Sequence, residues 1–343
     1  RVNGHILLIQ IQHIPFRNQC AGFLVIDDTV CLYCPMFREN FNMFKKATWL
    51  HLRIPFSYFL LPIYLFAIST SPNLSETGLL GLFLILHFFI YPASNAFNSY
   101  FDKDEESIGG LKNPPKEDKN VFYIAQAFDA LGLVLTVILF PGNWTLLLMV
   151  LVYILVSRAY SHPSIRLKKY PFLSWIIAGY FQGAWVVAMV YQGLNDFGFS
   201  SLFKFEVVVP GLLASAILWG SYPMTQVYQH EEDSKRGDQT LSLKLGILGT
   251  FHFTAFCFSL ASAAYFFYFN CVDQTKYGWQ FLIAMLPVLI YFGFWYFKVR
   301  QDPSIADHTH TMRLNLISAT CLGGFFLYYF LSTSQVLNVV GVY

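Results

Sequence analysis

Carboxylates crowd into two short stretches of the chain, and each stretch directly follows a long apolar run. The first stretch is NAFNSYFDKDEE at residues 95–106. On a helix, residues four apart share a face, so Asn98, Asp102 and Glu106 are predicted to form one polar stripe. Amide and carboxylate oxygens at this spacing could bind a hard cation together.

The second stretch is YQHEEDSKRGDQT at residues 228–240, where Gln229 and Asp233 repeat the four-residue spacing and Glu232 lies one position away. Oxygen ligands without thiols suit Mg²⁺, which binds one or two carboxylates and keeps positions for water and phosphate oxygens. Two such stripes that face each other could hold a diphosphate between metal ions. The predicted Mg²⁺ ligands are Asn98, Asp102, Glu106, Gln229, Glu232 and Asp233.

A simpler interpretation treats the acids as solvated loop residues, and it fits Asp104, Glu105 and Glu231 well. The amides are harder to explain in this way. Asn98 and Gln229 lie inside or at the edge of apolar runs, where polar groups are costly unless they face a cavity or a partner. Their presence favours a binding site.

The apolar runs are long enough to cross a membrane. Of the 343 residues, 55% are hydrophobic and 12% are charged, about half the charged fraction of an average soluble domain. Since about 20 apolar residues cross the hydrocarbon core, the sequence predicts an all-α, polytopic membrane protein with nine spans. The predicted spans are 50–70, 78–100, 121–140, 143–160, 172–193, 207–229, 244–269, 279–299 and 312–333.

Basic residues gather in alternate loops, as expected when those loops are cytoplasmic. Four lysines lie between spans two and three, whereas the loops of the opposite side hold only Lys204 and Lys276. We therefore predict that the N-terminal side of the first span and both acidic stretches face the cytoplasm, in a cytoplasmic (inner) membrane. The sequence has no basic patch with interleaved aromatic residues, so it does not predict a nucleic-acid partner.

Three parts of the chain are predicted to differ in role. Residues 1–47 are an N-terminal extension, either peripheral or a non-native upstream segment, and residues 334–343 are a C-terminal tail. The transmembrane domain occupies 48–333. Within it, Asp129 lies in the third span and is predicted to pair inside the bundle.

Three motifs, in register with the spans, resemble those of the UbiA superfamily of intramembrane prenyltransferases. That family carries N-x-x-x-D-x-x-x-D after its second span and D-x-x-x-D after its sixth. YSHPSIRLKKYP at 160–171 is similar to the Tyr, Pro and Arg/Lys motif after its fourth span. The resemblance implies nine helices around a central cavity, Mg²⁺ as the cofactor and a prenyl diphosphate as a substrate.

Two departures from the family pattern concern charge. Gln229 replaces the first acid of the second motif, so one expected carboxylate is neutral. Where many members have Arg-Pro after the first motif, this chain reads GGLKNPPK at 109–116, and either Lys112 or Lys116 would supply the positive charge.

The resemblance also implies roles for individual residues. Asp102, Asp233 and Tyr160 are the expected catalytic residues. The expected diphosphate-binding residues are Asn98, Lys112, Arg166, Lys168 and Lys235.

The leading hypothesis is Mg²⁺-dependent transfer of a polyprenyl group to an aromatic acceptor of the quinone-precursor type, within the lipid bilayer and with release of pyrophosphate. One alternative is a UbiA-type terpene cyclase, in which an internal alkene captures the allylic cation. Another is a cation-coupled transporter or lipid-binding protein. The last ranks lowest because transporter sites commonly lie near the membrane midplane, whereas these acids gather at one face.

Overall fold

The computed structural model describes residues 23–26, 29–32 and 45–334. The chain divides into two units, residues 1–42 and 43–343. In the first unit, β1 (Phe23–Ile26) pairs with β2 (Thr29–Leu32) as an antiparallel hairpin. Most of the predicted extension at 1–47 and nearly all of the tail at 334–343 lie outside the described residues, so their roles stay predictions.

The second unit is helical throughout its described part, as predicted. Nine segments within residues 45–334 are long and apolar enough to cross a membrane, and their ends differ from the predicted spans by four residues at most. The helices are α1 (Lys46–Leu52), α2 (Leu61–Ser69), α3 (Glu76–Leu84), α4 (Tyr91–Asp102), α5 (Lys119–Leu139), α6 (Trp144–Ser161), α7 (Pro171–Gln182), α8 (Ala184–Asn195), α9 (Phe205–Ser221), α10 (His230–Arg236), α11 (Leu241–Cys271), α12 (Thr275–Ala284), α13 (Leu286–Gln301) and α14 (His308–Thr333).

Several spans are interrupted rather than continuous. The first breaks at Arg53, whose φ of 46° is left-handed, and continues as a 3₁₀ segment that contains Pro55. In the sixth, α9 gives way to a 3₁₀ segment, Tyr222–Gln226, with Pro223 in its first turn. A proline lacks the N–H that donates a hydrogen bond in a continuous helix, so the regular helix is interrupted at such places. Irregular backbone at membrane depth is tolerated where it lines a cavity or is buried in protein.

Close helix contacts and aromatic packing hold the bundle together. At Gly183, between α7 and α8, an added Cβ would lie 2.6 Å from the backbone of Ser215 in α9. The rings of Phe66 and Phe326 stack with centroids 4.7 Å apart, which joins α2 to α14. Asp129 forms an ion pair with Arg158 of α6, so its predicted pairing inside the bundle is confirmed.

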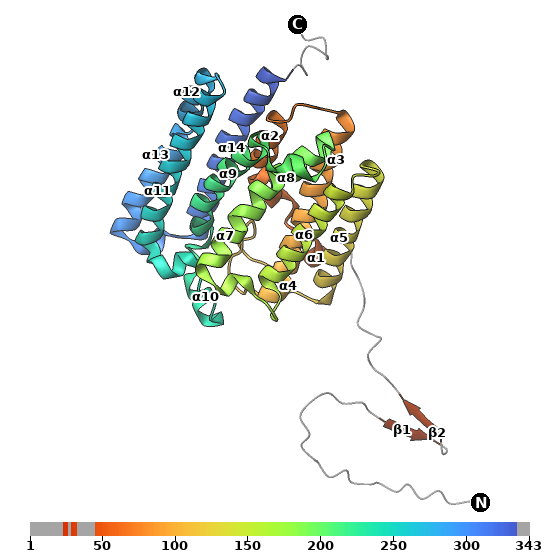
Figure 1. Ribbon diagram of the computed structural model, residues 1–343. Coiled ribbons are helices and arrows are strands. Elements are labelled where there is room, and N and C mark those ends of the chain that lie inside the picture. The colour runs from red at the N-terminus through yellow and green to blue at the C-terminus, as the bar shows by residue number, and fades with distance from the viewer. Residues whose placement is uncertain (1–22, 27–28, 33–44, 335–343) are drawn as a thin grey trace, which may run out of the picture. The chain divides into compact units, whose positions relative to one another are not determined.

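The short helix α10 lies at the end of the bundle where α4 terminates (Figure 1). α4 ends at Asp102, and Lys103 takes the left-handed conformation that closes the helix. α10 follows the broken sixth span, and the residue that caps its end, Gly237, also takes the left-handed conformation. The two acidic stretches, about 130 residues apart in sequence, are thereby brought to the same end of the bundle.

Candidate functional site

A cavity of about 340 Å³ opens within the helical unit. One part of its wall is charged and the rest is largely apolar. Six of the predicted site residues line it: Asn98, Asp102, Tyr160, Lys168, Gln229 and Asp233. Arg53, Asp104 and Arg236 line it as well. Residues of both acidic stretches therefore share one cavity wall.

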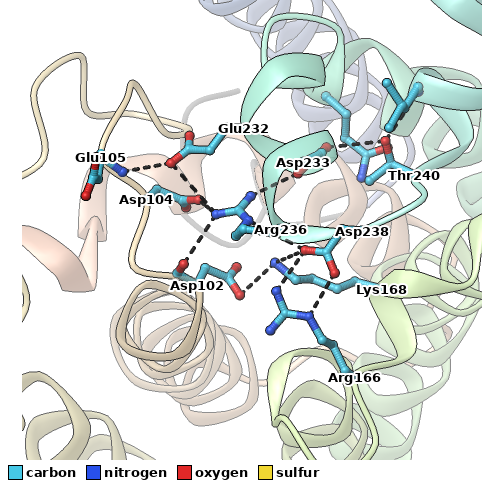
Figure 2. Close-up of polar contacts among 12 residues, drawn as sticks. Asp102, Asp104, Glu105, Arg166, Lys168, Glu232, Asp233, Arg236, Asp238 and Thr240 are labelled. Carbon is cyan, nitrogen blue, oxygen red and sulfur yellow. Dashed lines mark hydrogen bonds and ion pairs between the residues drawn. The ribbon is translucent and has the colours of Figure 1, made fainter.

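Lys168 joins the first acidic stretch to Asp238, near the end of the second. Its Nζ lies 2.7 Å from Oδ1 of Asp102 and 3.2 Å from Oδ2 of Asp238. Arg166 donates to both oxygens of Asp238 at 2.8 Å (Figure 2). Asp238 is 1% exposed; burial raises its pKa, but the hydrogen bonds from Arg166 and the charge of Lys168 outweigh burial and hold that pKa below its usual value.

Arg236 lies directly between the two acidic stretches (Figure 2). Its guanidinium donates to Asp233 at 2.9 Å, pairs with Asp104 and donates to the backbone carbonyl of Asp102 at 3.3 Å. Asp238 lies 3.6 Å away. A guanidinium with five N–H donors can bridge several oxygens at once, and here it links α10 to the end of α4.

Two carboxylates of α10 are buried, and one of them, Glu232, is only partly hydrogen-bonded. Oε1 of Glu232 accepts the backbone N–H of Glu105 at 2.7 Å, while its Oε2 is buried without a hydrogen-bond partner. Burial raises the pKa of Asp233 to about 7, although the charge of Lys168 opposes this shift. Buried carboxylates of this kind gain stability from a nearby cation.

A neutral hydrogen-bonded group borders the charged wall. The hydroxyls of Tyr160 and Tyr222 contact each other, and Nε2 of Gln226 donates to the Tyr222 hydroxyl at 3.2 Å. Asn98 accepts a hydrogen bond from Ser161 at 2.7 Å. Tyr222 and Gln226 lie in the 3₁₀ break of the sixth span, whereas Asn98 and Tyr160 lie near the ends of α4 and α6. All four line the cavity.

Five predicted site residues do not line the cavity. Glu106 and Lys112 are exposed. Lys235 has a side chain that is 64% exposed and pairs with Glu231 at 2.7 Å. Glu232 lies behind the wall, close to Arg236, which does line it. Arg166 lies further back and binds Asp238, which does not line the cavity either.

Sequence reasoning missed four charged residues of this site, although two of them carried a usable signal. The interpretation of Asp104 as a solvated loop residue is wrong, because its side chain is 10% exposed and pairs with Arg236. Arg236 lies three residues after Asp233 and so shares its helix face. Arg53 is a basic residue within an apolar span, which by default suggests a functional site. Asp238 lay in the second motif without an assigned role, and no spacing rule indicated that it would bind Arg166.

Arg53 is half-buried and has no carboxylate within ion-pair distance among the described residues. Its two terminal nitrogens donate to the carbonyls of Gly109 and Asn95, each at 3.0 Å, and its Nε has no hydrogen-bond partner. Because an isolated charge is costly to bury, this guanidinium is suited to an anionic ligand in the cavity.

The oxygen atoms that line the charged wall are of the kind that binds a hard divalent cation. Carboxylate and amide oxygens line the charged wall without thiols or imidazoles, and Glu232 keeps a buried oxygen free of hydrogen bonds. Across the described residues, no three His, Cys, Asp or Glu side chains already form a metal-binding group. The carboxylates are bridged by Arg236 and Lys168 instead.

Solved structures share this fold. A UbiA homologue from Archaeoglobus fulgidus bound to DMAPP and Mg²⁺ has a TM-score of 0.59 at 17% identity, over 84% of this chain and all of that one. The same homologue bound to GPP and Mg²⁺ gives 0.56 at the same identity and coverage. Digeranylgeranylglyceryl phosphate synthase gives 0.54 at 19% identity, over 84% of this chain and 98% of that one.

Sequence comparison leads to the same family. None of the curated proteins compared with the chain matches it significantly. The family model of the UbiA prenyltransferase family matches residues 59–317, well over half of the chain. Nine apolar helices within residues 45–334, a cavity with both acidic stretches on its wall and this match agree with one another: the chain is a multi-pass membrane protein that belongs to the UbiA prenyltransferase family.

Proposed function

We propose that this protein transfers a polyprenyl group from a prenyl diphosphate to an aromatic acceptor of the quinone-precursor type, with Mg²⁺ as its cofactor and release of pyrophosphate. Family membership supports prenyl transfer. One observation supports the aromatic acceptor most directly, and it is the position of Arg53. This half-buried guanidinium lines the same cavity as the acidic stretches, yet has no carboxylate partner among the described residues.

The charged wall would bind the diphosphate. Lys168 and Arg236 present cationic donors, and phosphate oxygens could replace some of the carboxylates that these side chains now contact. Asp102 and Asp233, with the amides of Asn98 and Gln229, would hold Mg²⁺. When bound, Mg²⁺ neutralises charge on the diphosphate oxygens as the bond to the allylic carbon breaks.

The apolar wall would bind the prenyl chain. Side chains from at least four spans contribute to it, among them Leu60, Ile63, Phe181, Ile217 and Leu322. Such a wall excludes water from the reacting carbon, which protects an allylic cation from hydrolysis. Aromatic faces can also stabilise positive charge at close range.

The acceptor would lie between these two walls. Arg53 is placed to bind a ring carboxylate, since a guanidinium and a carboxylate form a charge-assisted pair. The hydroxyls of Tyr160 and Tyr222 can orient a phenolic hydroxyl through hydrogen bonds. These groups together favour an acceptor of the hydroxybenzoate or dihydroxynaphthoate class.

The reaction balances with these participants. The bond between the allylic carbon and the diphosphate oxygen breaks, and pyrophosphate leaves with the electron pair. A ring carbon of the acceptor then forms a bond to the allylic carbon, and the ring loses one proton. We propose that this site faces the cytoplasm, because basic residues gather in the loops at that end of the spans.

The proposal can be tested with purified protein in detergent. Geranylgeranyl or longer prenyl diphosphates are offered with a panel of phenolic acids in Mg²⁺, and both pyrophosphate and organic products are identified by mass. We expect a prenylated aromatic acid that disappears with EDTA and with Asp102→Ala or Asp233→Ala. Glu231→Ala, on the exposed side of α10, should keep full activity.

Other products would contradict the proposal in distinct ways. Pyrophosphate accompanied only by a cyclised hydrocarbon or alcohol would identify a terpene cyclase. A complete lack of pyrophosphate release with every diphosphate would refute both enzymatic hypotheses for these substrates.

A further inference from the structure

Carboxylates outnumber cationic side chains where the two acidic stretches meet. We define the charged cluster as the side chains drawn together at the ends of α4 and α10. Its members are Asp102, Asp104, Glu232, Asp233, Asp238, Arg166, Lys168 and Arg236. With every group ionised, five carboxylates face three cations, so the two remaining negative charges match one divalent cation.

Arg236 holds the central position in the charged cluster. It contacts Asp104 from the first acidic stretch and Asp233 from the second, at 2.9 Å for the latter (Figure 2). Its side chain is 19% exposed, and it lines the cavity where the two stretches meet. A second metal ion between the same carboxylates would be repelled by this guanidinium at close range.

The second acidic stretch also supplies little charge for a metal of its own. Gln229 stands where a carboxylate would repeat the spacing of Asp233, and its amide is neutral. Glu232 lies behind the cavity wall, and one of its oxygens accepts a hydrogen bond from the backbone N–H of Glu105. Asp233 is therefore the one carboxylate that α10 itself presents to the cavity among the described residues, and Arg236 already contacts it.

We propose that Arg236 serves as a fixed cation in the place of a second metal ion, so that the protein binds one divalent cation per chain. The guanidinium would bind diphosphate oxygens from the side of α10, and the single cation would be held from the side of Asp102. This inference rests on the proposed function because it takes diphosphate as the ligand. It goes further in assigning one metal ion and a role to Arg236.

Counting bound Mn²⁺ tests this inference without reference to activity. Purified protein in detergent is titrated with Mn²⁺ in the presence of inorganic pyrophosphate, and unbound Mn²⁺ is measured by electron paramagnetic resonance, with a protein-free titration correcting for Mn²⁺ bound by pyrophosphate alone. We expect the wild-type protein to saturate at one Mn²⁺ per chain. Arg236→Gln should bind two, because Asp104 and Asp233 lose their shared cation, whereas Arg236→Lys should still bind one.

Lys235 provides a matched control next to Arg236 in sequence. It has the same charge but pairs with Glu231 on the exposed side of α10, so Lys235→Gln should leave the count at one. If Arg236→Gln does not fold, Gln229→Asp serves instead. The added carboxylate should then strengthen binding of the first Mn²⁺ at least tenfold while the count stays at one, because Arg236 is still present. A count of two in this variant would overturn the role of Arg236.

The outcomes separate this inference from the proposed function. Two Mn²⁺ bound to the wild-type protein would overturn the inference and leave prenyl transfer intact. No bound Mn²⁺ would overturn both the inference and the assigned cofactor. A count of one that persists in folded Arg236→Gln would refute the role of Arg236. A count of one without any prenylated product in the assay above would contradict the acceptor proposal alone.

Discussion

Asp238 provides the sharpest test of how the site is held together. Its carboxylate is 1% exposed, accepts two hydrogen bonds from Arg166 at 2.8 Å and lies 3.2 Å from Nζ of Lys168. Asp238→Asn keeps the size of the side chain and removes the charge. Two buried or half-buried cations then lose a shared anion.

The expected loss of stability follows from these contacts. Removing one partner of a buried ion pair commonly costs about 3–5 kcal/mol. Lys168 retains Asp102 at 2.7 Å, and Arg166 is 18% exposed and can be partly hydrated. We therefore expect a value near the lower limit, about 3 kcal/mol, which lowers the Tm of a chain this large by roughly 5 °C.

The pH dependence of this loss has a definite sign. The pKa of Asp238 in the folded protein lies below the ordinary value of 3.8. Its charge therefore contributes full stability above the unfolded-state pKa, and that contribution disappears as the pH falls through the lower folded-state value. The Tm difference between wild type and Asp238→Asn should be constant from pH 5 to pH 8 and narrow only below about pH 4.

Thermal unfolding in detergent, followed by intrinsic tryptophan fluorescence, measures this difference. Glu231→Gln is the matched control, because Glu231 also forms an ion pair but at the exposed surface of α10, and its Tm should not change. A Tm difference for Asp238→Asn that vanishes already at pH 6 would refute the reasoning. It would mean that the pKa of Asp238 is raised, and that burial outweighs the cations around it.

Three further substitutions and one control test the acceptor site and the packing of the bundle. Arg53→Gln should raise KM for carboxylate-bearing acceptors at least tenfold while leaving KM for the prenyl diphosphate unchanged, and an equal effect on a neutral phenol would contradict a carboxylate partner. Tyr160→Phe should slow transfer to the acceptor about tenfold without weakening pyrophosphate binding measured by calorimetry; a change in binding alone would place its hydroxyl at the diphosphate. Gly183→Ala should destabilise the protein by about 2 kcal/mol, because the new Cβ meets the backbone of Ser215 at 2.6 Å. Gly293→Ala, with nothing within 4 Å of its added Cβ, should leave the Tm unchanged or raise it.

The sequence by itself determined the membrane-spanning architecture. Apolar segments of about 20 residues specify spans because every backbone N–H and C=O must be satisfied inside the bilayer, which restricts each segment to a helix. In the described part of the helical unit, nine spans follow the predicted ones with end differences of four residues at most. The same local logic identified Asn98, Asp102 and Asp233, since a four-residue spacing places side chains on one helix face wherever the helix lies.

Only the tertiary structure decided which charges meet. Asp238 binds Arg166 and Lys168 across about 70 residues of sequence, and Arg236 contacts Asp104 across more than 130. Electrostatic partners depend on distance and burial in three dimensions, and neither is encoded in local spacing. For the same reason Lys235, adjacent to Arg236 and equally charged, lies at the exposed surface while its neighbour occupies the centre of the site.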